Sequence, residues 1–217
     1  MIESYGLHKE MDLYAYMIYT QKASEKALRI AESVEERLRK NGITIRNLNL
    51  KDINNEAKKI QKIYNDAWDE NWGFVPFTNA EFEFLKNDLK MIVDPSFAYI
   101  AEKDGEAIGF GLTIPNINEI LIKNKRGKLF PFGIFRLLFG KGKTKTVRVL
   151  ALGVLKEYRK SGIEAIFFAK NISEAKKRNL IGGEASWVLE NNKPMRDAAE
   201  HLNGERYKTY RLYKKSI

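Results

Sequence analysis

Residues 149–163 read VLALGVLKEYRKSGI, and this stretch decides the fold of the chain. It begins as an apolar strand, passes through a short basic turn that contains Gly162, and then opens a helix. A helix N-terminus presents free backbone N–H groups and the positive end of the helix dipole, which together attract phosphate. Arg159 and Lys160 add positive charge at the same place. The stretch therefore predicts a site for a phosphorylated small molecule, although an ordinary strand-to-helix turn capped by Ser161 would have the same sequence.

Outside this stretch, the chain from residue 43 alternates between the periodicities of strands and helices. The order is β-α-α-β-β-β-α-β-α-β, which predicts a mixed α/β fold with an antiparallel start and one parallel βαβ pair at the turn. We expect strands at 43–50, 97–102, 107–114, 146–155, 185–189 and 207–213, and helices at 52–68, 78–89, 163–178 and 194–202.

An N-terminal strand and helix precede this order. Residues 13–19 form an apolar, tyrosine-rich run, and residues 22–40 place their apolar side chains on one helical face. Asn41-Gly42 then ends the helix, because glycine readily adopts the left-handed conformation that follows a helix. We expect a boundary here, with residues 1–41 as an N-terminal strand and amphipathic helix and residues 42–217 as the main domain.

Composition excludes several classes of site. The chain has 217 residues, no cysteine and two histidines, so disulfides, thiolate metal sites and a cysteine nucleophile are excluded and we expect no metal site. We find neither an apolar run of about 18 residues, as a membrane-spanning helix needs, nor a basic leader followed by an apolar core. A cytoplasmic protein is therefore expected.

The net charge of +10 is concentrated in one segment. Residues 119–148 hold nine basic side chains against one acid, Glu119, so their field attracts anions. They overlap a long connection at about 116–146, which has an apolar centre between lysines. This insert could dock on an anionic membrane, form a lid over the site, or be a short helix packed on the domain. We favour a membrane over nucleic acid, because the segment lacks a nucleic-acid-binding motif.

Leu152-Gly153-Val154, leading to Arg159-Lys160-Ser161-Gly162 within this element order, resembles the GNAT superfamily of acyl-CoA-dependent N-acyltransferases. The family signature is Gln or Arg, two residues, Gly, one residue, and then Gly or Ala. Arg159 and Gly162 match it, whereas Glu164 stands at the last position. The resemblance covers roughly residues 43–217 and implies a GNAT-like mixed sheet.

A second segment is similar to a subgroup of bacterial GNAT-like proteins of poorly defined substrate. It consists of Asn65-Asp66-Ala67-Trp68 and of Asn71-Trp72-Gly73-Phe74-Val75-Pro76. In that subgroup a second GNAT-like module can precede this one. Residues 1–20 resemble the tail of such a module, so residues 1–41 are expected to hold its remnant.

The resemblance implies acetyl-CoA or a longer acyl-CoA as donor. In GNAT enzymes the two strands that flank the helix diverge, the pantetheine arm bonds to the first strand, and the pyrophosphate lies on the turn. An asparagine also often contacts the arm. Carried onto this sequence, the expected cofactor-binding residues are Leu152, Gly153, Val154, Arg159, Lys160, Ser161, Gly162, Ile163, Glu164 and Asn192.

Acyl transfer to an amine requires a group that removes a proton and one that protonates the departing thiolate. Glu184 and Glu190 share one face of a predicted strand by alternation, and either can be the base or a solvated strand-end acid. The tyrosine that GNAT enzymes often carry falls at Ala199, which has no hydroxyl. Catalysis by positioning alone, or CoA binding without catalysis, therefore stays open.

The acceptor side is expected to involve the aromatic loop at residues 71–77. Trp72, Phe74 and Phe77 are either substrate-binding residues or a plug for the core. The function predicted from the sequence is an acyl-CoA-dependent N-acyltransferase acting on a small amine, which could be lipid-like. The alternatives are a catalytically silent CoA-binding or regulatory module, and a basic protein that binds a membrane surface or nucleic acid.

Overall fold

The computed structural model describes residues 2–122, 124, 128, 133, 135 and 139–215. Its centre is a mixed sheet of seven strands in the order β2-β3-β4-β5-β6-β1-β7. The strands are β1 (His8–Tyr19), β2 (Ile43–Asn47), β3 (Ala98–Lys103), β4 (Glu106–Pro115), β5 (Thr146–Val154), β6 (Gly182–Leu189) and β7 (Glu205–Lys214). The helices are α1 (Glu25–Lys40), α2 (Ile53–Ala67), α3 (Asn79–Ile92), α4 (Asn118–Leu121), α6 (Ile163–Lys177) and α7 (Lys193–His201).

The predicted mixed α/β class and the order of elements from residue 43 are confirmed. Strands β2 to β5 are antiparallel neighbours, whereas β5 and β6 are parallel and joined through α6. The turn between β3 and β4 has positive φ at Asp104 (51°) and Gly105 (85°), as a tight hairpin requires.

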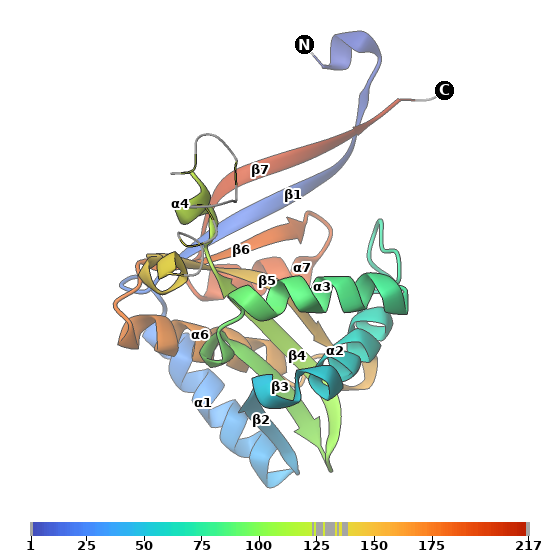
Figure 1. Cartoon of the computed structure of the whole chain (residues 1–217). Helices are drawn as coiled ribbons and strands as arrows, with labels where there is room; N and C mark the ends of the chain where they lie inside the picture. The colour runs from blue at the N-terminus through green and yellow to red at the C-terminus, as the bar shows by residue number, and fades with distance from the viewer. Residues whose placement is uncertain are drawn as a thin grey trace.

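Strand β1 lies inside the sheet, antiparallel to both β6 and β7. Its register with β7 runs from His8 opposite Lys214 to Met17 opposite Glu205. Figure 1 shows these two strands side by side, extending beyond the other strands toward both ends of the chain. The division at residue 41 stays a prediction. In the structure, β1 and α1 belong to the same sheet and core as residues 42–217.

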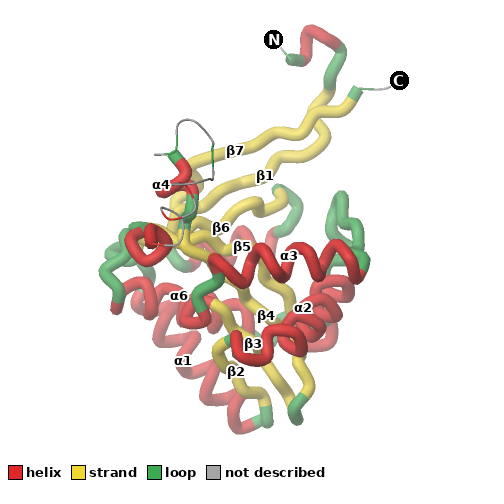
Figure 2. Tube along the Cα trace, in the orientation of Figure 1, coloured by secondary structure: helices red, strands yellow, loops and turns green. Residues whose placement is uncertain are grey.

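Helices cover both faces of the sheet (Figure 2). On one face α1, α6 and α7 bury a core that includes Leu28, Phe167 and Ala199. On the other face α2 and α3 pack over β3, β4 and β5, around Ile63 and Phe110. Since neighbouring residues of a strand point to opposite faces, the sheet residues divide between these two cores.

The ends of the elements follow local side-chain chemistry. The Ser24 hydroxyl accepts a hydrogen bond from the Ala27 N–H and starts α1, and Gly42 (φ 77°) follows its end. Thr78 and Glu81 form the capping box expected for α3. The prediction that the strand from residue 43 extends to 50 is wrong. It ends at Asn47, and a 3-10 turn begins at Leu50, preceded by the Asn49 side chain as a cap.

The two ends of the predicted insert are joined to each other. The Glu119 carboxylate accepts hydrogen bonds from the backbone N–H groups of Lys145 (2.8 Å) and Thr146 (3.0 Å), and the Asn116 N–H bonds to the Thr146 carbonyl (3.0 Å). The apolar centre of the insert falls largely outside the described residues, so its expected role as a lid, a membrane contact or a packed helix stays a prediction.

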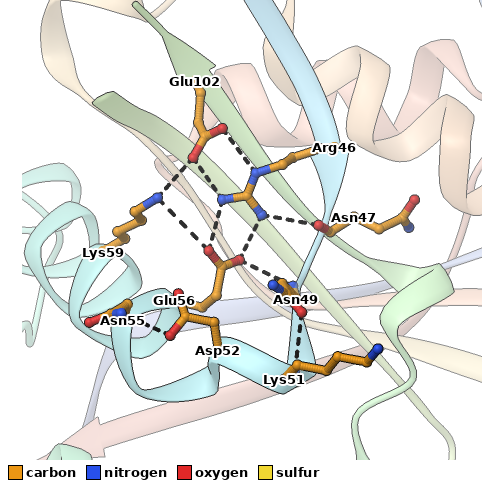
Figure 3. A network of polar contacts seen from close by, with 9 residues as sticks. All are labelled: Arg46, Asn47, Asn49, Lys51, Asp52, Asn55, Glu56, Lys59 and Glu102. Carbon is orange, nitrogen blue, oxygen red and sulfur yellow. Dashed lines mark hydrogen bonds and ion pairs between the residues drawn. The ribbon is translucent and has the colours of Figure 1, made fainter. Parts of the chain in front are cut away.

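An ionic network connects α2 to the edge of the sheet (Figure 3). The Arg46 guanidinium contacts the carboxylates of Glu56 (2.8 Å) and Glu102 (2.7 Å), each through two hydrogen bonds. Lys59 adds an ion pair to Glu102 (2.9 Å), and the Asn49 N–H donates to Glu56 (3.2 Å). Glu56 is 3% exposed, and burying its carboxylate would be costly without these partners.

Candidate active site

Strands β5 and β6 pair over only part of their length. Their register runs from Thr146 opposite Gly182 to Val149 opposite Ala185 and ends there. Beyond this point β5 continues to Val154 beside β4, whereas β6 continues beside β1. The two strands thus diverge toward their carboxyl ends, where α/β sheets place ligands. The divergence that the family resemblance implies is present.

The turn after β5 has a backbone that requires glycine. Lys160 (φ 66°) and Gly162 (φ 98°) are both left-handed, and α6 begins directly after them. A Cβ atom at Gly162 would lie 2.8 Å from Cγ1 of Val34 on α1, so any other residue would clash as well as strain the backbone. The sequence singled out Gly162 for close backbone approach, and the structure adds the contact with α1.

Unpartnered polar groups gather at this turn. Ser161 Oγ is buried without a hydrogen-bond partner, and within the described part of the chain no acceptor is found for the N–H groups of Gly162 and Ile163. Ser161 does not cap the helix, because Gly162 occupies the N-cap position and no side chain bonds there. The alternative of a turn capped by Ser161 is therefore wrong. A buried hydroxyl and free amides at a helix N-terminus suit a pyrophosphate.

The cations of the turn are held by the end of α2. Arg159 donates to the Ala67 carbonyl (2.8 Å) and pairs with Glu70 (3.0 Å), while Lys156 pairs with Asp69 (2.8 Å). The Arg159 guanidinium thus lies between the turn and α2. Among the expected cofactor-binding residues, Lys160 forms no ion pair with any described residue.

Glu164 is the departure from the family signature, and it lies in the first turn of α6. Burial raises the pKa of its carboxyl group, although the nearby Arg159 charge and its own backbone N–H oppose the effect. A raised pKa means that this carboxyl group is more readily neutral. It therefore competes less with a phosphate than an ordinary glutamate at this position would.

Other expected cofactor-binding residues have structural roles as well. The Leu152 carbonyl accepts a hydrogen bond from Nε1 of Trp68 (3.0 Å), which leaves one lone pair for a ligand. A Cβ at Gly153 would lie 3.0 Å from the Phe110 ring, and Val154 is buried in the core. Asn192 caps α7 by accepting from the Met195 N–H (3.2 Å). No local sequence pattern predicts the Trp68 contact, which spans 84 residues.

Glu184 lies one register pair before the strands diverge, opposite Arg148 of β5. Its carboxylate is 3.2 Å from the Arg148 guanidinium and accepts hydrogen bonds from the hydroxyl groups of Ser186 and Tyr207. Burial alone would raise the pKa of Glu184. The two hydroxyl donors and the Arg148 and Lys208 charges outweigh burial, so the pKa lies below its ordinary value.

Tyr207 is the site residue that sequence reasoning missed. The position aligned with the family tyrosine, Ala199, is fully buried in the core, whereas Tyr207 brings a hydroxyl to Glu184 from β7. Burial and the Glu184 carboxylate raise the pKa of Tyr207, so its hydroxyl keeps its proton and donates it. Only the packing of β7 beside β1 brings Tyr207 to Glu184, so no local sequence pattern could reveal the pair.

Glu190 lies away from this cluster, after the end of β6 and about 20 Å from Glu184 at the rise of a strand. Its carboxylate pairs with Lys9 (2.6 Å) and accepts from the Asp12 N–H (3.1 Å). Lys9 first, and then the Asp12 N–H, lower the pKa of Glu190. The structure therefore does not bring the two expected catalytic carboxylates together.

The aromatic loop divides between packing and exposure. The rings of Phe74 and Phe77 lie 5.6 Å and 5.0 Å from the Tyr64 ring of α2, as a plug for the core would. Trp72 is 41% exposed and lies beside β1, where it helps Lys214 to lower the pKa of Glu10. Trp72 is thus the loop aromatic with the most surface free for a ligand, and its substrate role stays a prediction.

Within the described ranges, no cluster of three or more histidine, cysteine or acidic side chains is arranged to hold a metal ion. In that same part of the chain, no helix has both the length and the apolar character that crossing a membrane demands.

Comparison with known proteins agrees with this geometry. The model of the acetyltransferase (GNAT) family matches residues 57–204. The chain is 37% identical to the bacterial ceramide synthase of Caulobacter vibrioides (strain NA1000 / CB15N) and 37% identical to Protein YghO of Escherichia coli (strain K12). Each match covers 100% of this chain, which spans 57% and 56% of the lengths of these relatives.

A solved GCN5-related N-acetyltransferase from Sphaerobacter thermophilus has the same fold. Its TM-score is 0.64 over 98% of this chain and 53% of that chain, at 14% identity. A likeness at this identity supports the fold and not the substrate. The family match over residues 57–204 contains the diverging strands and the turn at Gly162. The chain therefore belongs to the acetyltransferase (GNAT) family.

Proposed function

We propose that this chain is an N-acyltransferase that moves an acyl group from CoA to a long-chain amine. The observation that carries the proposal is the divergence of β5 and β6 beside a turn with an unpartnered buried hydroxyl and free amides. These groups fit the pyrophosphate of CoA, and the backbone of β5 beyond Val149 borders the path of its pantetheine arm. The family match supports an acyl-CoA donor, either acetyl-CoA or a longer one.

The residues around Glu184 supply the proton chemistry. A bound acyl-CoA supplies a thioester, whose C–S bond breaks as the C–N bond to the amine forms. The Glu184 carboxylate takes the proton that the amine loses, since its lowered pKa keeps it ionised at neutral pH. Tyr207 donates to that carboxylate and provides the hydroxyl nearest to it for returning a proton to the thiolate. Arg148 holds the carboxylate at the point of divergence.

Exposed apolar side chains lie on the same strands as this cluster. Leu150 lies on β5 where the strands diverge, and Trp187 of β6 is 65% exposed, with its ring 5.9 Å from that of Tyr210. Exposed aromatic and aliphatic groups beside a proton-accepting carboxylate suit an amine with a hydrocarbon chain. The similarity to a protein named bacterial ceramide synthase supports the same class of acceptor.

The insert supports a membrane location for this chemistry. Ile122 and Phe139 are 77% and 73% exposed, and the surrounding segment 119–148 holds nine basic residues in the sequence. Exposed apolar side chains among cations favour the surface of an anionic bilayer. We therefore place the reaction in the cytoplasm at a membrane surface, where a long-chain amine would be found.

Release of free thiol from a long-chain acyl-CoA tests the proposed function. We expect turnover with a long-chain amine and little with a short amine such as ethanolamine, and faster turnover in anionic than in neutral vesicles. Trp187→Ala should raise the KM for the long-chain amine about tenfold, because contact area with the hydrocarbon chain is lost. The same substitution should leave the KM for acyl-CoA unchanged.

Absence of thiol release with every amine, despite CoA binding, would overturn the enzyme proposal in favour of a silent CoA-binding module. Equal rates in both kinds of vesicle would remove the argument for a membrane surface. If Trp187→Ala changed the KM for long and short amines equally, the exposed aromatic pair of Trp187 and Tyr210 would not be part of the acceptor site.

Gly162→Val is expected to weaken CoA binding by at least about a hundredfold in isothermal titration, because it combines left-handed strain with a steric clash. Gly6→Val is the matched control. Gly6 is also left-handed (φ 74°), but a Cβ there meets only the Lys215 side chain at 3.9 Å. CoA affinity that falls equally in both variants would indicate general destabilisation and not a phosphate-binding turn.

A further inference from the structure

A basic stripe runs along the outer side of α1. It borders a shallow hollow of about 570 Å³, and its members are Lys26, Arg29, Ile30, Ser33, Val34 and Arg37. These positions recur every three or four residues, so they form one face of the helix. The acids Glu32 and Glu35 line a different cavity on the opposite side of α1. Helix α1 also precedes residues 57–204, which the family model matches.

Within the described chain the cations of the basic stripe form no close ion pair, although Lys176 first, and then the Arg29 charge from a longer range, lower the pKa of Glu25. Lys26, Arg29 and Arg37 form no ion pair with any residue that the structure describes. Three of the four acids of α1 are paired elsewhere: Glu25 with Lys176 and Glu35 with Lys170 of α6, and Glu36 with Arg39 and Lys40. The fourth, Glu32, lines the cavity on the opposite side of the helix. The stripe therefore keeps its full positive charge on a helix whose other charges are largely balanced.

The basic stripe passes the turn at Gly162 near its Arg37 end. Val34 is the residue whose Cγ1 would lie 2.8 Å from a Cβ at Gly162, so the stripe and the turn are in contact. From Lys26 to Arg37 the stripe is about 16 Å long at the rise of an α-helix. One phosphate group needs only one or two cations, so a stripe of this length suits a larger anionic partner.

We propose that the basic stripe docks an acidic acyl carrier protein, whose 4′-phosphopantetheine arm then enters at the turn. The inference rests on the proposed acyltransferase function. The arm ends in the same thioester as acyl-CoA, so the C–S bond to the carrier breaks, the C–N bond forms, and the amine proton reaches the carrier thiolate. An acidic helix of the carrier complements the three cations, and Ile30, which is 53% exposed between them, offers an apolar contact.

The test compares one acyl group on two donors, a bacterial acyl carrier protein and CoA. We expect K26E/R29E/R37E to lower kcat/KM with the carrier protein at least about tenfold and to leave kcat/KM with acyl-CoA within about twofold. The matched control is K51E/K58E/K62E, which makes the same charge change at exposed lysines in and before α2, on the other face of the sheet. Added salt should slow the wild-type protein with the carrier donor only.

Three outcomes would overturn the inference. They are wild-type turnover with acyl-CoA but not with the carrier protein, equal losses of kcat/KM with both donors in the stripe variant, and equal losses of kcat/KM in the stripe and control variants. The first of these leaves the proposed function standing. If neither donor gives turnover, the proposed function fails. Docking of the carrier protein is then tested separately, by the fluorescence anisotropy of labelled carrier protein. Binding to the wild type and the control, but not to the stripe variant, supports docking, whereas equal binding to all three contradicts it.

Discussion

Glu184→Gln is expected to lower kcat by about 10²–10⁴-fold, the usual contribution of a general base. The amide keeps the shape of the carboxyl group but cannot accept the amine proton. Binding of acyl-CoA should change little, because Glu184 lies next to the point of divergence and not at the turn proposed to bind the pyrophosphate. Single-turnover kinetics and CoA titration separate the two effects.

Glu190→Gln is the matched control for that experiment, since this carboxylate pairs with Lys9 away from the diverging strands. We expect near wild-type kcat from it. Comparable losses in both variants, or a larger loss for Glu190→Gln, would contradict the assignment of the base to Glu184.

The pH profile provides a second readout for the same pair. Hydrogen bonds help to hold the pKa of Glu184 below its ordinary value, so wild-type activity should persist on the acid side of the pKa of a free glutamate. Tyr207→Phe removes one donor and should therefore shift the acid limb to higher pH. A profile that does not move would show that Tyr207 has no influence on the base.

Arg46→Ala should produce the largest loss of stability. It leaves the carboxylate of Glu56, which is 3% exposed, with Lys59 at 3.9 Å as its remaining cation, and removing one partner of a buried ion pair costs about 3–5 kcal/mol. Denaturation in urea measures the loss. Lys40→Ala, which removes the exposed partner of Glu36 at 3.8 Å, should cost less than about 1 kcal/mol. Similar losses for the two variants would refute a structural role for the network.

The same network predicts how stability depends on pH. Arg46 first, and then Lys59, lower the pKa of Glu102 to about 2 in the folded chain. An unfolded glutamate titrates near about 4.3, so this stabilisation is present above that pH and is lost as pH falls toward 2. The urea midpoint of the wild type should drop over this range, and that of Arg46→Ala should drop less.

Local signals in the sequence were sufficient to predict the helices and the turn after β5. The capping box of Thr78 and Glu81, the glycine after α1 and the basic turn at Gly162 depend on neighbours in the chain. The family resemblance then predicted the divergence of β5 and β6. Position 162 could be recognised because its backbone conformation excludes most other residues.

The remainder of the site depends on contacts between distant segments. Tyr207 reaches Glu184 only because β7 packs beside β1, and Trp68 reaches Leu152 across 84 residues. Alternation placed Glu184 and Glu190 on one face of a strand. It could not show that the partners of Glu184 come from β5, β6 and β7, whereas those of Glu190 come from β1. Such pairings follow from the order of strands in the sheet, which periodicity does not encode.

The position of β1 has a consequence for biosynthesis. This strand leaves the ribosome before the other strands of the sheet, yet both of its neighbours, β6 and β7, come last in the order of strands. Contacts with so large a sequence separation form slowly, and unpaired strand edges expose a nascent chain to aggregation. Strand β1 must therefore wait, unpaired, until β6 and β7 have been synthesised before this part of the sheet can close.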